Sequence, residues 1–330
     1  MNPRLAFRFA ENVLATVMDW GARPSTPSQT TLARQLLADL DALMVAGKTE
    51  QGSDFWQGIC VELHRLAASG DPMYFMRWPA IEATMVHGAA PVTLRMWRML
   101  RRSPDWRKLW APALRHPRYG HPPPFAPMLS TNAIALEHAS HLFRFQQRQA
   151  VHFHDTDCIV EFGGGYGSMC RLTRALGFRG KYIVFDLPPV SALQRYYLGM
   201  HGIETDGTGG SATWLCNDLD AIAGWLEREA PGRVSLISTW ALSEMPMFVR
   251  QRIEPFFLLP AMTKILLAYQ PEFEGTDNRG YFRDLMARTS EKWRWAELNV
   301  DPSGKAPTAA DSLYAFGIAD ARGSSADRAT

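Results

Sequence analysis

The chain lacks three features that would indicate its cellular environment or its partners: paired cysteines, a large excess of one charge and long apolar runs. Its four cysteines show no Cys-x-x-Cys spacing, which favours buried reduced thiols over metal ligands: Cys60, Cys158, Cys170 and Cys216. The formal net charge of +2 gives no strong field, so the composition does not indicate a nucleic-acid partner. No apolar run approaches the roughly 18 residues that a membrane-spanning helix needs.

The N-terminal segment also lacks the apolar core of a secretory signal, because Arg4, Arg8, Glu11 and Asp19 interrupt its hydrophobic residues. We therefore expect a cytoplasmic protein. Hydrophobic residues are plentiful, at 46% of 330, which is enough to bury a sizeable core.

Two periodicities divide the chain. Apolar residues recur at helical spacing up to about Leu114, and a proline-rich run between His116 and Pro127 cannot continue a helix. The predicted division is an N-terminal helical domain with its linker at 1–128, a connecting helix at 129–150, an α/β domain at 151–320 and a disordered tail at 321–330.

After residue 155, predicted strands alternate with helices. The strands are expected at 158–161, 181–185, 213–216, 234–238, 265–269, 295–298 and 313–318. Such alternation is typical of a parallel sheet covered on both faces, and the short spacing of the last two strands indicates a closing antiparallel pair. The predicted fold class is therefore α/β, with a Rossmann-like seven-stranded sheet and an N-terminal all-helical domain.

The run CIVEFGGGYGSMCRL, residues 158–172, indicates a buried strand, a glycine turn and a helix start in direct succession. Its glycines let the backbone turn sharply and approach a ligand, and the helix from Ser168 would point free N–H groups at a bound anion. This arrangement is typical of a small-molecule cofactor site. A turn that only packs the helix on the strand is the alternative.

The glycine spacing separates two classes of cofactor. A dinucleotide site has Gly-x-Gly-x-x-Gly, and Ser168 stands where its third glycine would fall. Residues 161–167 instead fit Glu-x-Gly-x-Gly-x-Gly, which resembles motif I of the class I S-adenosylmethionine-dependent methyltransferases. Asp186, nineteen residues beyond Gly167, matches the ribose-binding acid of these enzymes. The resemblance implies S-adenosylmethionine as cofactor, with a dehydrogenase as the weaker alternative.

Three longer runs resemble a narrower group. VEFGGGYGSMCRL, KYIVFDLPPVSALQRYYL and SLISTWALSEMPMFVRQRIEPFF are similar to the bacterial sugar O-methyltransferase family, over about residues 130–300. This resemblance implies a hydroxyl of a sugar or glycan as the acceptor. O- or N-methylation of a non-sugar natural product or peptide stays open, as does a non-catalytic S-adenosylmethionine-binding protein.

The resemblance assigns the cofactor contacts to residues that follow the predicted strands. Tyr166 would pack near the sulfonium, and Asp218 would accept from the adenine amino group unless it only starts a helix. The predicted cofactor-binding residues are Glu161, Gly163, Gly164, Gly165, Tyr166, Gly167, Asp186, Leu187, Asn217, Asp218, Ser238 and Thr239.

Methyl transfer to a hydroxyl also needs a group that removes the hydroxyl proton. Glu244 matches the family's glutamate and is the first candidate for this base, with helix capping or substrate orientation as its alternative role. His138 and His141, three residues apart on one predicted helix, are the runner-up bases, unless they only cover the sheet edge. The predicted acceptor-binding residues are Trp240, Tyr269 and Asn278.

A histidine pair and a basic, tryptophan-rich segment have structural roles as their favoured interpretation. His152 and His154 have no carboxylate cluster beside them, so no metal is predicted. Segment 95–118 mixes arginines with tryptophans, which favours solvated arginines around inward tryptophans over contact with RNA, an anionic glycan or a membrane surface. We expect a small-molecule or glycan substrate, and a homodimer stays open.

Overall fold

The computed structural model describes residues 13–19, 26–46, 52–86, 91–299 and 313–320, so the predicted tail at 321–330 lies outside the described residues. Two compact units are distinguished by their internal contacts, and both are discontinuous in sequence. The first comprises 1–143, 165–179 and 187–215, and the second 144–164, 180–186 and 216–330.

The first unit is mainly helical. Its helices are α2 (Pro27–Ala46), α3 (Asp54–Ser69), η1 (Pro72–Arg77), α4 (Pro79–Thr84), α5 (Pro91–Arg101), η2 (Trp106–Trp110), α6 (Ala111–Leu114), the start of α7 (Ala133–Gln149), α8 (Ser168–Ala175) and α9 (Pro188–Met200). Its short strands β3 (Thr205–Asp206) and β4 (Thr213–Cys216) pair in parallel.

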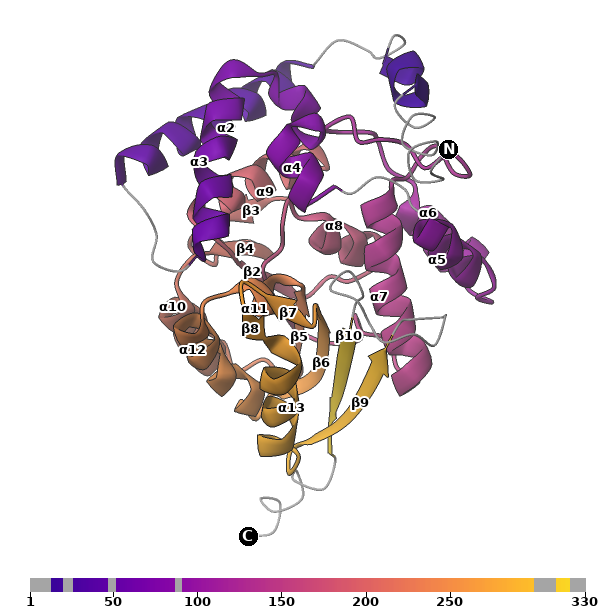
Figure 1. Ribbon diagram of the computed structural model, residues 1–330, viewed down its shortest axis with the longest axis vertical. Coiled ribbons are helices and arrows are strands. Elements are labelled where there is room, and N and C mark those ends of the chain that lie inside the picture. The colour runs from indigo at the N-terminus through magenta and orange to yellow at the C-terminus, as the bar shows by residue number, and fades with distance from the viewer. Residues whose placement is uncertain (1–12, 20–25, 47–51, 87–90, 300–312, 321–330) are drawn as a thin grey trace. The chain divides into compact units, whose positions relative to one another are not determined.

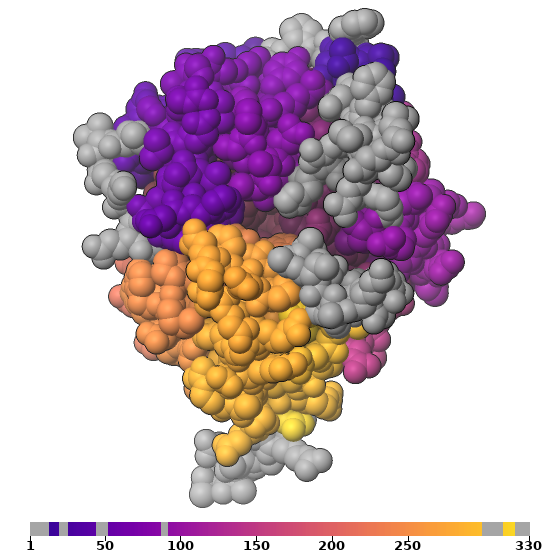
Figure 2. Space-filling view, viewed as in Figure 1, coloured from indigo at the N-terminus to yellow at the C-terminus, as the bar shows by residue number. Residues whose placement is uncertain are grey.

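Close packing between α2 and α9 holds the first unit together. A Cβ at Gly199 would stand 2.9 Å from Leu32 Cδ2, so the two helices meet closely where α9 lacks a side chain. Leu36 and Leu40, one and two turns further along α2, are 1% exposed. In space-filling view, residues 26–46 and 52–86 form a continuous packed surface on the face shown (Figure 2).

The second unit is built on a mixed, mostly parallel sheet in the order β2-β1-β5-β6-β10-β9 (Figure 1). Its parallel strands are β1 (Cys158–Phe162), β2 (Lys181–Phe185), β5 (Val234–Thr239) and β6 (Met262–Tyr269). The closing antiparallel strands are β10 (Leu313–Ala319) and β9 (Trp293–Asn299). The other elements are α10 (Leu219–Glu229), α11 (Ala241–Glu244), α12 (Met247–Leu258), β7 (Glu272–Phe273), β8 (Thr276–Asp277) and α13 (Asn278–Arg288).

The predicted fold class is confirmed: the chain is α/β, and helices precede the mostly parallel sheet in sequence. Every predicted strand is present, and the closing antiparallel pair is also found. Several strands extend beyond the prediction, since β1 includes Phe162 and β6 begins at Met262. β1 is buried along its whole length, as expected of a strand with both faces covered.

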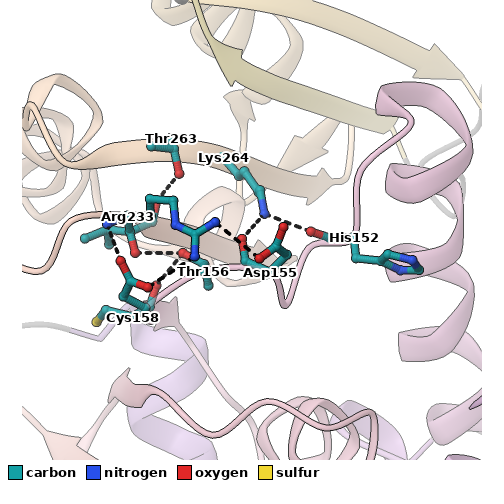
Figure 3. A network of polar contacts seen from close by, with 9 residues as sticks. His152, Asp155, Thr156, Cys158, Arg233, Thr263 and Lys264 are labelled. Atoms are coloured by element: carbon teal, nitrogen blue, oxygen red, sulfur yellow. Dashed lines mark hydrogen bonds and ion pairs between the residues drawn. The ribbon is translucent and has the colours of Figure 1, made fainter. Parts of the chain in front are cut away.

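A polar network fixes the amino ends of the parallel strands (Figure 3). Lys264 of β6 donates through Nζ to the carbonyl oxygens of His152, at 2.8 Å, and Asp155. Arg233, just before β5, forms ion pairs with Asp155 and Asp157 at 3.2 and 3.3 Å. These contacts join β5 and β6 to the segment before β1, at the end of the sheet opposite the glycine turn.

In the basic, tryptophan-rich segment, Trp97 and Trp106 are half-buried, so the expected inward position is found for Trp110. Trp110 is 1% exposed, whereas Arg98, Arg101 and Lys108 are exposed. The Arg101 guanidinium lies over the Trp97 ring, 4.6 Å from its centroid. Among the described residues, no helix combines the length and hydropathy needed to cross a membrane.

Candidate functional site

The carboxyl ends of β1, β2 and β5 lie side by side in the second unit. The strand register pairs Phe162 with Phe185 and Glu161 with Ile237. Gly163, directly after β1, donates its N–H to the Phe185 carbonyl at 2.8 Å. Ligands of open α/β sheets bind at this edge. Predicted residues gathered there are Glu161, Gly163, Asp186, Ser238 and Thr239.

Gly163 marks the closest approach between the turn after β1 and the segment after β5. Its φ is +76°, and an added Cβ would stand 1.9 Å from the Ala241 Cβ. Any other residue would clash with the start of α11 and be strained in the left-handed region. This glycine therefore has a packing reason as well as the predicted ligand-binding one. Gly164 beside it is buried.

Glu161 is a buried carboxyl, and the Tyr182 hydroxyl donates to its Oε2 at 2.8 Å. Its exposed fraction is 1%. Burial raises the pKa of Glu161 from 4.5 to about 8. The hydrogen bond from Tyr182 lowers this pKa and the neighbouring Asp186 raises it, but both effects are smaller than that of burial. At neutral pH this side chain is therefore largely protonated.

Asp186, Asn217 and Asp218 are drawn together by backbone contacts. The Asp186 N–H donates to the Cys216 carbonyl at 3.3 Å, and Asn217 Nδ2 donates to the Asp186 carbonyl at 2.6 Å. Asp218 is exposed and caps α10, since its Oδ1 accepts from the N–H groups of Asp220 and Ala221. Asn217 thus orients the Asp186 peptide. Asp218 starts helix α10, which is the alternative role expected for it from the sequence.

The end of β5 leads into a strained turn. Ser238 Oγ donates to the Phe162 carbonyl and accepts from the Leu242 N–H, both at 3.0 Å. Trp240 has φ +72° and ψ −45°, a conformation that costs a non-glycine residue of order 1–3 kcal/mol. Its N–H donates to the Ala268 carbonyl at 2.6 Å, which ties the turn to β6. Thr239 is 9% exposed at the same strand end.

Glu244 stands at the end of α11, half-buried, and its Oε1 accepts from Gln270 Nε2 at 3.2 Å. Asn278, at the start of α13, is fully buried, and its Oδ1 accepts from Arg250 at 2.7 Å. Tyr269 is 2% exposed, and its ring packs on Phe282 with centroids 4.1 Å apart. The structure therefore places Glu244 at the end of α11 and Asn278 at the start of α13, whereas the Tyr269 ring packs in the core.

The rest of the predicted glycine-turn residues belong to the first unit. Gly165 has φ +51°, and its carbonyl accepts from Gln194 of α9 at 2.9 Å. Gly167 has φ +96° and caps α8, while Leu187 precedes α9. Tyr166 is 2% exposed and its ring packs edge-on against Tyr197, with centroids 4.9 Å apart.

The runner-up bases lie on α7 in the first unit, as predicted from their spacing. His141 is fully buried and His138 half-buried, with ring centroids 6.1 Å apart. Sequence reasoning missed their neighbour Glu137, whose pKa burial raises from 4.5 to about 7. A carboxyl with such a pKa is suited to exchange a proton near neutral pH.

Sequence reasoning also missed Tyr182 and Arg250. Tyr182 sits inside an apolar strand, where nothing distinguishes it from a core aromatic. Arg250 had a signal, because it falls on the buried stripe of α12 formed by Val249, Ile253 and Phe256. A cation at such a position must be compensated by buried partners.

His152 and His154 have ring centroids 5.1 Å apart. Within the described ranges, no three His, Cys, Asp or Glu side chains are grouped so that they could hold a metal ion.

No protein-family model and no curated protein matches the chain. Solved structures of methyltransferases share its fold at low identity. The methyltransferase domain of bacterial CtHen1 has a TM-score of 0.39 at 12% identity, covering 53% of this chain and 97% of that one. A SAM-dependent methyltransferase from Aquifex aeolicus has a TM-score of 0.35 at 9% identity, covering 54% and 90%. Precorrin-6y C5,15-methyltransferase from Geobacter metallireducens has a TM-score of 0.35 at 11% identity, covering 59% of this chain and 91% of that one. At these TM-scores the likenesses carry no functional argument.

Glu161→Gln is expected to change how stability depends on pH. The folded carboxyl keeps its proton up to about pH 8, whereas the unfolded one releases it above about 4.5, so the wild type loses stability as pH rises between these values. Glutamine has no such proton. The variant should therefore gain roughly 2–4 kcal/mol relative to wild type between pH 5 and 8.5 in urea unfolding. Exposed Glu227→Gln is the control, and a difference between Glu161→Gln and wild type that does not change with pH would contradict the assignment.

Gly163→Ala should destabilise the protein more than Gly275→Ala. The two glycines have nearly equal φ, +76° and +77°, but nothing lies within 4 Å of a Cβ at Gly275. Both variants carry the left-handed strain, and only Gly163→Ala adds the clash with Ala241, expected to cost about 1–3 kcal/mol more. Urea unfolding measures the difference, and equal losses would show that the close approach is absent.

Proposed function

We propose that the chain is an S-adenosylmethionine-dependent O-methyltransferase whose acceptor is a hydroxyl of a sugar or glycan. One observation carries the proposal. Gly163, which tolerates no side chain, and Asp186, an acid that follows the neighbouring strand, lie together at the carboxyl edge of the sheet. A sharp backbone turn beside a ribose-binding acid is what this cofactor requires.

The donor set fits the cofactor. Asp186 would hold the two ribose hydroxyls through charge-assisted hydrogen bonds, and Asn217 fixes its peptide for that task. The turn beginning at Gly163 would receive the amino-acid end, because its glycines let the backbone approach a ligand closely. When bound, S-adenosylmethionine supplies an electrophilic methyl group with a thioether as its leaving group.

The residues of this chain then have two tasks, to orient the acceptor hydroxyl and to remove its proton. Glu244 accepts that proton at a carboxylate oxygen, while the Gln270 amide holds Oε1 by a hydrogen bond. The strained turn at Trp240, anchored to β6, keeps α11 and Glu244 at the carboxyl end of β5.

The sugar acceptor is supported by the run Asp186-Leu187-Pro188 after β2 and the run Ser243-Glu244-Met245 after β5, which resemble the sugar O-methyltransferase pattern. A peptide or a non-sugar natural product is the second candidate for the acceptor. The sequence resemblance favours a sugar over a peptide or other natural product, and the transfer assay below tests this choice of acceptor.

Calorimetric titration tests the cofactor half of the proposal. Wild-type protein should bind S-adenosylmethionine and S-adenosylhomocysteine, and Asp186→Ala should weaken binding at least tenfold because it loses the ribose contacts. Exposed Asp284→Ala on α13 is the matched control and should bind as wild type does. A well-folded wild type that binds neither compound would refute the proposal.

Transfer of a tritiated methyl group tests the reaction, using a panel of sugars, nucleotide sugars, glycans, peptides and small phenols. We expect label in a carbohydrate, and a Glu244→Gln loss of turnover of about 10²–10⁴-fold with S-adenosylmethionine affinity within threefold of wild type. Exposed Glu272→Gln should keep full activity. Label only in peptides or phenols would replace the sugar acceptor, and cofactor binding with no transfer would favour a non-catalytic binding protein.

A further inference from the structure

Arg250 is a buried cation without a carboxylate partner. It is 1% exposed on the inward side of α12, and within the described ranges its guanidinium forms no ion pair. Burial lowers the pKa of Arg250 below its usual 12.5, and its Cζ lies 5.1 Å from the centroid of the Tyr281 ring. A buried charge is retained at a cost, so its hydrogen bonds show what it is used for.

Those hydrogen bonds enclose Glu244. Arg250 Nε donates to the Met245 carbonyl at 2.8 Å, and one terminal nitrogen donates to the Ser243 carbonyl at 2.7 Å. The two accepting peptides therefore lie on either side of Glu244 in the chain. Because the guanidinium is rigid and planar, two such bonds fix both peptides relative to α12 and thereby the direction in which the Glu244 side chain leaves the backbone.

The third bond closes a ring of contacts around the same residue. The other terminal nitrogen of Arg250 donates to Asn278 Oδ1 at 2.7 Å, and the Asn278 N–H donates to the Pro271 carbonyl at 3.1 Å. Pro271 follows Gln270, whose amide donates to Glu244 Oε1. Backbone and carboxylate of Glu244 are thus held from two sides through one connected network.

We propose that Arg250 is the positioning residue of the reaction, which sets the place of the Glu244 carboxylate by gripping the peptides on both sides of it. This inference rests on the proposed function, because it assigns a purpose to Arg250 only if Glu244 acts on the acceptor. Arg250 itself touches neither acceptor nor cofactor. It acts through the backbone, and it links Glu244 to Asn278, the predicted acceptor-binding residue at the start of α13.

Arg250→Ala, Arg250→Lys and Arg252→Ala form the test set. Arg252 lies two residues along α12, is exposed and pairs with Asp220 at 3.1 Å, so its variant is the matched control. In the tritiated methyl assay, Arg250→Ala should lower kcat at least 100-fold with the KM for S-adenosylmethionine within threefold. Added guanidinium chloride at tens of millimolar should restore at least tenfold of that loss, and Arg252→Ala should show neither loss nor rescue.

Arg250→Lys keeps the charge, but its compact ammonium lacks the rigid planar fork that reaches all three acceptors, so its kcat should fall between those of Arg250→Ala and wild type. Wild-type kcat in Arg250→Lys together with Arg250→Ala would overturn the proposal. An equal loss of kcat and cofactor affinity in Arg250→Lys, without guanidinium rescue of Arg250→Ala, would also overturn it, because it would show general damage. Should Arg250→Ala not fold, Arg250→Lys alone decides by the same split between kcat and KM.

A readout that needs no acceptor separates this inference from the proposed function. Amide hydrogen exchange over residues 240–248 should be at least tenfold faster in Arg250→Lys than in wild type and unchanged in Arg252→Ala. Faster exchange in a protein whose wild type transfers no methyl group would confirm the grip on the segment and refute only the reaction. Unchanged exchange in Arg250→Lys would refute the positioning role whatever the activity.

Discussion

The close approach between the turn after β1 and the start of α11 is the constraint on which the candidate site depends. Gly163 allows this approach, since a Cβ there would stand 1.9 Å from the Ala241 Cβ. The contact brings the ends of two neighbouring strands together, and Ser238 joins them by bonding both the Phe162 carbonyl and the Leu242 N–H. Backbone strain at Trp240 follows from the same geometry, because the chain must turn at once to enter α11.

Around this contact the sheet edge holds two buried ionisable groups, and the structure compensates them in different ways. Glu161 is largely neutral at pH 7, because burial raises its pKa to about 8 even though the hydrogen bond from Tyr182 lowers it. Arg250 stays charged and is surrounded by two carbonyls and an amide oxygen. Burying either group would be unfavourable without such partners. Their retention at one edge of the sheet is typical of a site rather than of a core.

The sequence was sufficient for the seven longer strands and for the turn, but not for the two-residue strands β3, β7 and β8 or for the side-chain contacts between distant segments. Strands 181–185 and 213–216 consist mainly of apolar residues that end at Asp186 and Asn217, so their limits were predicted correctly. The contact of Arg250 with Asn278 spans 28 residues, and no local pattern encodes it. From the sequence, Asp218 could be expected either to bind adenine or to cap a helix. The hydrogen bonds that cap α10 become visible in the three-dimensional structure.

A crystal structure of the protein with S-adenosylhomocysteine tests the central claim most directly. The account predicts that the ribose hydroxyls bond the Asp186 carboxylate, that the amino-acid end lies in the turn beginning at Gly163, and that the sulfur faces the side on which Glu244 stands. A ligand bound away from Gly163 and Asp186, or none at saturating concentration, would contradict it.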